Sequence, residues 1–127
     1  MSNVKTYRIS ADWFSDAEVT LQVDHDVLTP ELATEINQFW SSDADRLDQE
    51  GGDVVRAVIR LFGSIAIRFF MADGGASFGS RGDSRHWTDA VIKEQGEGWP
   101  DRDGLGILIT EASVPAVGYD DVTVVTA

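Results

Sequence analysis

The chain has 127 residues, a net charge of −12 and no cysteine, and 43% of its residues are hydrophobic. This length and apolar content suffice for one folded domain over residues 1–127 and argue against disorder. The absence of cysteine excludes disulfides, thiolate chemistry and cysteine-ligated zinc.

The N-terminus lacks an apolar run of the length of a secretory signal, and its first residues resemble the start of a strand. The longest apolar-rich stretch, Val54 to Met71, is interrupted by Arg56, Arg60 and Arg68. Charges at this spacing are not tolerated in a membrane-spanning helix. We therefore expect a cytoplasmic protein without a membrane partner.

Apolar and polar residues alternate over residues 6–11 and again over 18–23. A period of two is typical of half-buried strands. Because the connection between the two segments is short and polar, we expect them to form an antiparallel hairpin.

The next segments carry helix signals. Thr29 and Pro30 suit the cap and the first position of a helix, and apolar residues then recur at intervals of three or four up to Trp40. The acidic residues 43–50 are expected to form a second helical piece. After two glycines, Asp53 is a plausible cap for a helix over 53–72, whose apolar face covers more than half of its circumference and makes it the expected central helix.

In the C-terminal half, residues 73–85 are rich in glycine and serine and are expected to be a loop. Residues 86–95 fit a short helix, and residues 96–104 form a turn-rich connector. Alternating apolar residues predict a third strand over 105–109 and a fourth over 122–124. The strands thus come in runs separated from the helices. This order predicts an α+β fold with a four-stranded antiparallel sheet and helices packed on one face.

Two short motifs carry a family resemblance. Glu35-Ile-Asn-Gln-Phe-Trp-Ser41 lies in the first predicted helix, and Glu97-Gly-Trp-Pro-x-x-Asp-Gly104 precedes the third strand, with the double glycine between them. In these features the chain resembles the domain of unknown function 2528 family, whose members are small bacterial proteins often encoded on prophages and plasmids. The resemblance runs from the first strand to the end of the chain. It implies a cytoplasmic accessory protein of a mobile element, and it supplies no catalytic residue.

Acidic residues crowd the N-terminal third of the chain. Twelve acidic residues and one basic residue, Arg46, lie between Asp12 and Asp53. Such a field attracts cationic partners and repels nucleic acid, and a folded surface of carboxylates can occupy a basic nucleic-acid groove. The residues expected to form this acidic interaction surface are Asp12, Asp16, Glu18, Asp24, Asp26, Asp43, Asp45, Asp48, Glu50 and Asp53. A solvated acidic face that merely keeps the protein soluble explains the same composition.

The leading hypothesis is a non-enzymatic interaction protein of a mobile element. Its acidic surface would act in the manner of a nucleic-acid mimic on a basic partner, such as a nucleic-acid-binding or defence protein of the host, without direct nucleic-acid binding. Trp13 and Trp99 fall in predicted turns and are candidate aromatic anchors for that partner. Packing over the end of the sheet is the alternative role of these two side chains.

No catalytic or metal-binding motif stands out, and no cofactor is expected. Asp43-x-Asp45 begins like a calcium loop, but the expected glycine at position six and glutamate at position twelve are replaced by Asp48 and Val54. His25 lies between two aspartates, which is a weak ligand pattern and is typical of a surface turn. The stripe formed by Arg56, Arg60 and Arg68 is expected to pair with the acidic hairpin or the first helix.

Two other functions remain open. A small-ligand or enzyme domain would use a pocket between the sheet and the helices, with residues 74–84 as a lid and His86 or the Asp101–Asp103 turn at its mouth. A structural homo-oligomer would form through an exposed edge strand, for which the valine-rich C-terminal strand is the candidate.

Overall fold

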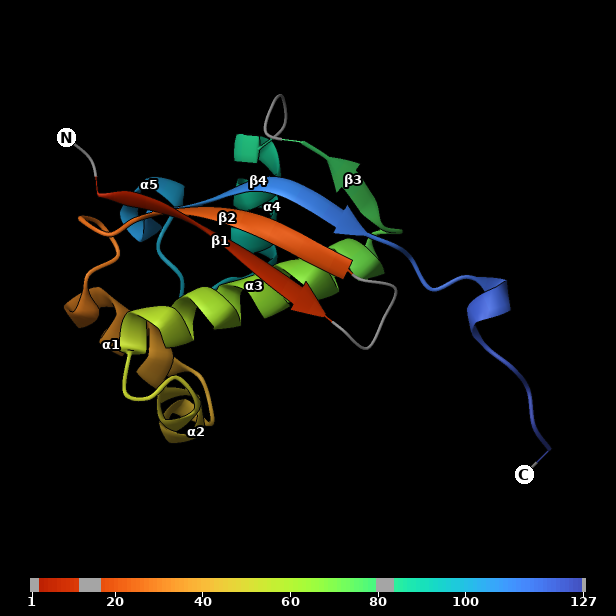
Figure 1. Cartoon of the computed structure of the whole chain (residues 1–127), viewed down its shortest axis with the longest axis horizontal. Coiled ribbons are helices and arrows are strands. Elements are labelled where there is room, and N and C mark those ends of the chain that lie inside the picture. Colours follow the sequence, from red (N-terminus) through yellow and green to blue (C-terminus); the bar gives the residue numbers. More distant parts are fainter. Residues whose placement is uncertain (1–2, 12–16, 80–83, 127) are drawn as a thin grey trace.

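The computed structural model describes residues 3–11, 17–79 and 84–126. Its centre is a four-stranded antiparallel sheet with the strand order β1-β2-β4-β3 (Figure 1). The strands are β1 (Val4–Ala11), β2 (Ala17–Asp24), β3 (Ala76–Phe78) and β4 (Ile107–Val114).

The predicted N-terminal hairpin is confirmed. β1 and β2 pair along their whole length, with Tyr7 opposite Leu21 and Ala11 opposite Ala17. The β2–β4 register shifts beside Leu21, so that one residue of β4, Thr110, is extra. Such a bulge bends the strand and strengthens its twist. The hydroxyl of Thr110 donates a hydrogen bond to the Thr20 carbonyl across the bulge at 3.3 Å.

Five helices and one short 3-10 turn in the described part of the chain accompany the sheet. They are α1 (Pro30–Phe39), α2 (Asp43–Gln49), α3 (Val54–Ala72), α4 (Ser84–Gln95), α5 (Arg102–Leu105) and the 3-10 turn η1 (Tyr119–Asp121). The caps predicted for α1 and α3 are both present. The Thr29 hydroxyl accepts a hydrogen bond from the Leu32 amide at 3.3 Å, and the Asp53 carboxylate accepts one from the Arg56 amide at 3.0 Å.

α3 is the central helix, as its composition predicts. It lies along one face of the sheet and contacts β1, β2 and β4, while α1 packs against α3 and α4 packs against β4 (Figure 1). Phe62 and Phe70 of α3 and Leu21 of β2 are among the largest fully buried side chains. The other side of β1, β2 and β4 is polar and largely exposed, so the α+β class with helices on one face is confirmed.

The structure corrects two strand predictions. The predicted loop over 73–85 contains β3, which is the fourth strand, and residues 122–124 do not join the sheet. β3 forms because Phe78 packs against Phe70 and Trp87, with ring centroids 5.8 and 6.1 Å away, and this packing compensates for weak local propensity. A third correction is smaller: Leu105, predicted to begin a strand, ends α5. No helix in the described part of the chain is long and apolar enough to cross a membrane.

Candidate interaction surface

The corner between α1 and α2 is built around Asn37. This side chain is 3% exposed, although asparagine is usually found at the surface. Its Nδ2 donates a hydrogen bond to the Asp43 carbonyl at 3.1 Å, and its Oδ1 accepts one from Arg46 Nε at 2.7 Å. The buried amide therefore fixes how α2 is held against the end of α1.

Arg46 completes this corner. Its Nη1 donates to the Ser41 carbonyl at 2.6 Å, and its Nη2 donates to the Asn37 and Trp40 carbonyls at 2.9 and 3.1 Å. These carbonyls lie at the C-terminal end of α1, where the helix dipole attracts a cation and α1 itself has no basic residue. Arg46 is the only basic residue between Asp12 and Asp53, and its guanidinium group is therefore used to bind backbone carbonyls.

The outward side of α2 is left acidic. Asp45 and Asp48 are exposed and three residues apart, so they share one helical face, and Asp43, which is half-buried, lies in the first turn of the same helix. Within the described residues, no lysine or arginine lies within ion-pair distance of these three carboxylates. We call Asp43, Asp45 and Asp48 the α2 acidic face.

Other members of the predicted acidic surface have structural partners. Glu18 pairs with Arg8 across the hairpin at 3.3 Å, and Asp53 caps α3. The Asp24 carboxylate accepts a hydrogen bond from the exposed Asp26 amide at 3.0 Å, as in a turn. Their charges are therefore partly used to hold the fold together.

Glu50 is the most strongly compensated of the predicted residues. Its side chain is 13% exposed and binds Arg56 at 3.1 Å and Arg60 at 2.7 Å. These two arginines were expected to pair with the hairpin or with α1, and instead they pair with the residue that follows α2. With Arg8 they line a surface groove of about 280 Å³ between β1 and α3.

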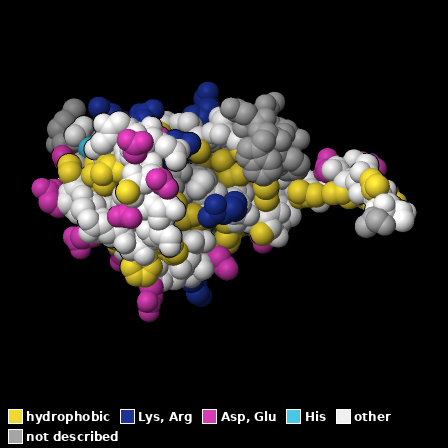
Figure 2. Space-filling view, turned by 90° about the horizontal axis from the view of Figure 1, so that it is seen from below, with side chains coloured by type: hydrophobic (Ala, Val, Ile, Leu, Met, Phe, Trp, Pro, Cys, Tyr) yellow, Lys and Arg dark blue, Asp and Glu magenta, His cyan; other side chains and the backbone are white. Residues whose placement is uncertain are grey.

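Acidic side chains are spread over the end of the molecule that carries α1 and α2, with uncharged surface between them (Figure 2). The exposed Glu31 and Glu35 of α1 add to the charge there. The candidate interaction surface therefore no longer includes every acidic residue between Asp12 and Asp53. It consists of the α2 acidic face with Glu31 and Glu35 of α1 nearby. Asp12, Asp16 and Trp13 lie outside the described residues.

Trp99 is buried, so its predicted exposure as an aromatic anchor is wrong. The side chain is 8% exposed, with its ring centroid 5.3 Å from that of Phe62 and 6.4 Å from that of Trp40. Beside it, Gly98 has a φ of +94°, and a Cβ there would overlap the Phe39 ring. The two motifs that carry the family resemblance thus pack against each other: Trp99 is part of the core and Trp40 packs against it, while Phe39 is 53% exposed.

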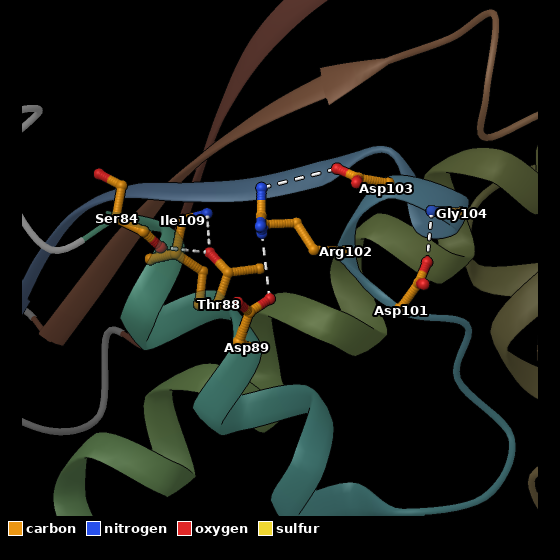
Figure 3. Close-up of polar contacts among 8 residues, drawn as sticks. All are labelled: Ser84, Thr88, Asp89, Asp101, Arg102, Asp103, Gly104 and Ile109. Carbon is orange, nitrogen blue, oxygen red and sulfur yellow. Dashed lines mark hydrogen bonds and ion pairs between the residues drawn. The ribbon is translucent and has the colours of Figure 1, made fainter.

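The region of the alternative pocket is held by structural hydrogen bonds (Figure 3). Asp101 caps α5 by accepting from the Gly104 amide at 2.8 Å, and Arg102 binds Asp89 at 3.0 Å. His86 is exposed and packs edge-on against the Trp87 ring, with centroids 5.1 Å apart. The proposed mouth residues therefore do not converge on one described cavity, and the space between sheet and helices is filled by core side chains.

Thr88 ties α4 to the sheet (Figure 3). Its side chain is fully buried, donates to the Ser84 carbonyl at 2.7 Å and accepts from the Ile109 amide at 2.9 Å. Thr88→Val keeps the shape and leaves that amide unpaired, so we expect the free energy of unfolding to fall by about 1–3 kcal/mol in urea titrations. Thr88→Ser keeps the hydroxyl and should lose less; an equal loss in both variants would contradict the role of the hydrogen bond.

His25 has a structural partner as well. Its Nε2 lies 2.8 Å from the Tyr7 hydroxyl, which ties the turn after β2 to β1. Among the described residues, no three histidine, aspartate or glutamate side chains are grouped so that they could hold a metal ion.

Comparison with known proteins yields relatives and a family. The chain is 34% identical over 129 aligned residues to "Lambda prophage-derived protein ea10" of Escherichia coli O6:H1 and to "Protein ea10" of Escherichia phage lambda, with full coverage of each chain. No solved structure matches it. A family model described as "Protein of unknown function (DUF2528)" matches residues 18–124, and the chain belongs to that family.

Proposed function

We propose that this protein is a non-enzymatic accessory factor of a prophage that binds a basic protein through the α2 acidic face. The context comes from the relatives, one of which is named as prophage-derived. The chemistry comes from a net charge of −12 and from carboxylates that lack cationic neighbours among the described residues. The partner would be a host nucleic-acid-binding or defence protein with a basic groove.

The orientation of Arg46 supports this proposal most directly. Were this guanidinium directed outward between Asp45 and Asp48, it would screen both carboxylates and reduce the local field. It instead donates to the carbonyls at the end of α1. The arrangement leaves a helical turn of negative charge, which a basic groove that binds phosphates can recognise.

The net negative charge of the protein disfavours direct binding to DNA or RNA. Bringing a surface of this sign to a phosphate backbone is repulsive over a Debye length of about 8 Å at physiological salt. A protein partner with clustered arginine and lysine gains from the same field through faster association and through release of its counterions.

The experiment is a capture of partners from bacterial lysate at low and at high salt. The variant Asp43→Asn/Asp45→Asn/Asp48→Asn should reduce the affinity for the captured protein by about tenfold or more, because three charge contacts of about 0.5 kcal/mol each are lost. The matched control is Glu94→Gln/Glu97→Gln/Glu111→Gln, which removes the same charge from exposed positions elsewhere.

The two triple variants separate a specific surface from net charge. If the control variant weakens capture as much as the α2 variant, total charge alone is responsible. If the captured proteins are not basic, or if high salt leaves capture unchanged, the proposed function is wrong.

A further inference from the structure

The end of the chain after β4 is apolar and exposed. Seven large hydrophobic side chains in the described part of the protein are exposed, and five of them lie between residues 117 and 125. They are Val117 at 59%, Tyr119 at 92%, Val122 at 58%, Val124 at 97% and Val125 at 84% exposure. Exposed apolar side chains this concentrated mark an interaction site. We call residues 117–126 the C-terminal tail.

The tail is suited to strand pairing. Val122 has φ −128° and ψ 155°, which are strand values, and the residues from Val122 to Thr126 are all β-branched. The chain leaves the end of β4 and runs away from its own domain (Figure 1). Residues 122–126 form no strand within the described protein, but the extended backbone at Val122 and the β-branched composition suit this segment to pair as one.

β1 offers the complementary edge. It is an outer strand of eight residues, and it carries a row of backbone groups without a sheet partner on its free side. The opposite edge, β3, has three residues and offers far less. One of the two remaining exposed hydrophobic side chains, Val4 at 39% exposure, also lies in β1.

Charge selects the tail over a second β1 as the partner. β1 contains Lys5 and Arg8 and no acidic residue, and Arg8 pairs with Glu18 of β2. The charge of Lys5 would therefore be brought near its own copy if two β1 strands were placed side by side. The tail contains Asp120 and Asp121 and no basic residue. The charge of β1 thus disfavours pairing with a second β1 and is complementary to the charge of the C-terminal tail.

Topology places the tail on another molecule. Ser113 of β4, Glu18 of β2 and Ser10 of β1 lie in register, so β4 ends at the side of the sheet where β1 is connected to β2. To reach β1 of its own chain, the tail would have to cross that connection. Connections that cross at the same end of a sheet are avoided in protein folds.

We propose that the C-terminal tail of one copy pairs with β1 of a second copy, and that the exchange is reciprocal. Each sheet gains a fifth strand, formed by Val122–Thr126 of the other chain, and a two-fold dimer results. The inference goes beyond the proposed function and does not depend on the α2 acidic face. It also replaces the expectation that the C-terminal strand is itself the edge of the sheet.

Sedimentation of the full-length protein at low to high micromolar concentration tests the proposal, with a dimer of twice 13.9 kDa as the expected species. Val124→Pro removes a backbone donor from the pairing strand and should raise the dimer dissociation constant about tenfold or more. Val124→Thr keeps the donor and the β-branched shape and should stay within about twofold of the original. Because Val124 is 97% exposed, neither change should affect the circular dichroism of the domain.

A charge exchange identifies the acceptor strand. Lys5→Glu should weaken the dimer, and adding Asp120→Lys should restore much of the loss. A monomeric wild-type protein at high micromolar concentration would overturn the proposal, and so would a Val124→Pro variant that dimerises normally. A dimer that is indifferent to Lys5→Glu would rule out β1 as the acceptor. None of these results bears on partner capture by the α2 acidic face.

Discussion

Asn37→Ala is expected to lower the free energy of unfolding by about 2–4 kcal/mol. The substitution leaves the Asp43 carbonyl and Arg46 Nε without their partner and opens a small void at a position that is 3% exposed. Urea titration followed by circular dichroism gives this quantity directly. Gln38→Ala on the exposed side of the same helix is the matched control and should change stability by less than about 0.5 kcal/mol.

The coupling between Asn37 and Arg46 is equally testable. Arg46→Met keeps much of the apolar stem and removes the donors to the end of α1. Since the two side chains share one hydrogen-bonded network, the double variant should lose clearly less than the two single losses combined. Additive losses would show that the corner is held by packing alone. The same variants should weaken partner capture if the α2 acidic face depends on this corner.

The helices could be predicted from the sequence because their signals are local. Thr29 and Asp53 are caps whose partners lie three residues away, and the apolar spacing of α1 and α3 reports a face that is buried in the structure. β1 and β2 could be predicted equally well, because apolar and polar residues alternate along each strand and the two strands are adjacent in sequence. These features need no knowledge of distant contacts.

The strands at the C-terminal side depended on distant partners. β3 has three residues and lies in a segment dominated by glycine and serine. It forms because it pairs with β4 and because Phe78 packs against the Phe70 ring. Residues 122–124 have the stronger strand pattern and have no such partner among the described residues of their own chain. Local propensity was therefore misleading at residues 76–78 and at residues 122–124, because strand formation depends more on a neighbouring strand than on the local sequence pattern.

The acidic surface was predicted in composition and missed in detail. Counting charges cannot show that Arg46 is directed into the fold, that Glu50 holds two arginines, or that Asp53 serves as a cap. The capping role of Asp53 has a local signal, because Asp53 precedes a helical apolar pattern, and it is predicted from the sequence even though Asp53 is also counted with the acidic surface. The pairing of Glu50 with Arg56 and Arg60 has no such local signal, because it depends on the angle between α2 and α3.

The second large effect concerns Trp99. Trp99→Ala should lower the free energy of unfolding by about 3–5 kcal/mol, which corresponds to a fall in melting temperature of about 10 °C or more. The reason is the cavity left between Trp40 and Phe62, whose rings lie 6.4 and 5.3 Å from the indole. Differential scanning calorimetry measures the change. A surface anchor would behave differently, because truncation of an exposed side chain lowers the affinity for the partner and leaves the stability of the fold almost unchanged.

Trp99→Phe separates volume from polarity at the same site. The indole Nε1 of Trp99 is buried and has no hydrogen-bond partner within the described residues, so phenylalanine removes a ring without breaking a polar contact. We therefore expect a loss of about 1–2 kcal/mol, clearly smaller than that of alanine. An equal loss in both variants would mean that the indole nitrogen has a partner of its own. A stable Trp99→Ala variant with impaired capture would return this side chain to the interaction surface.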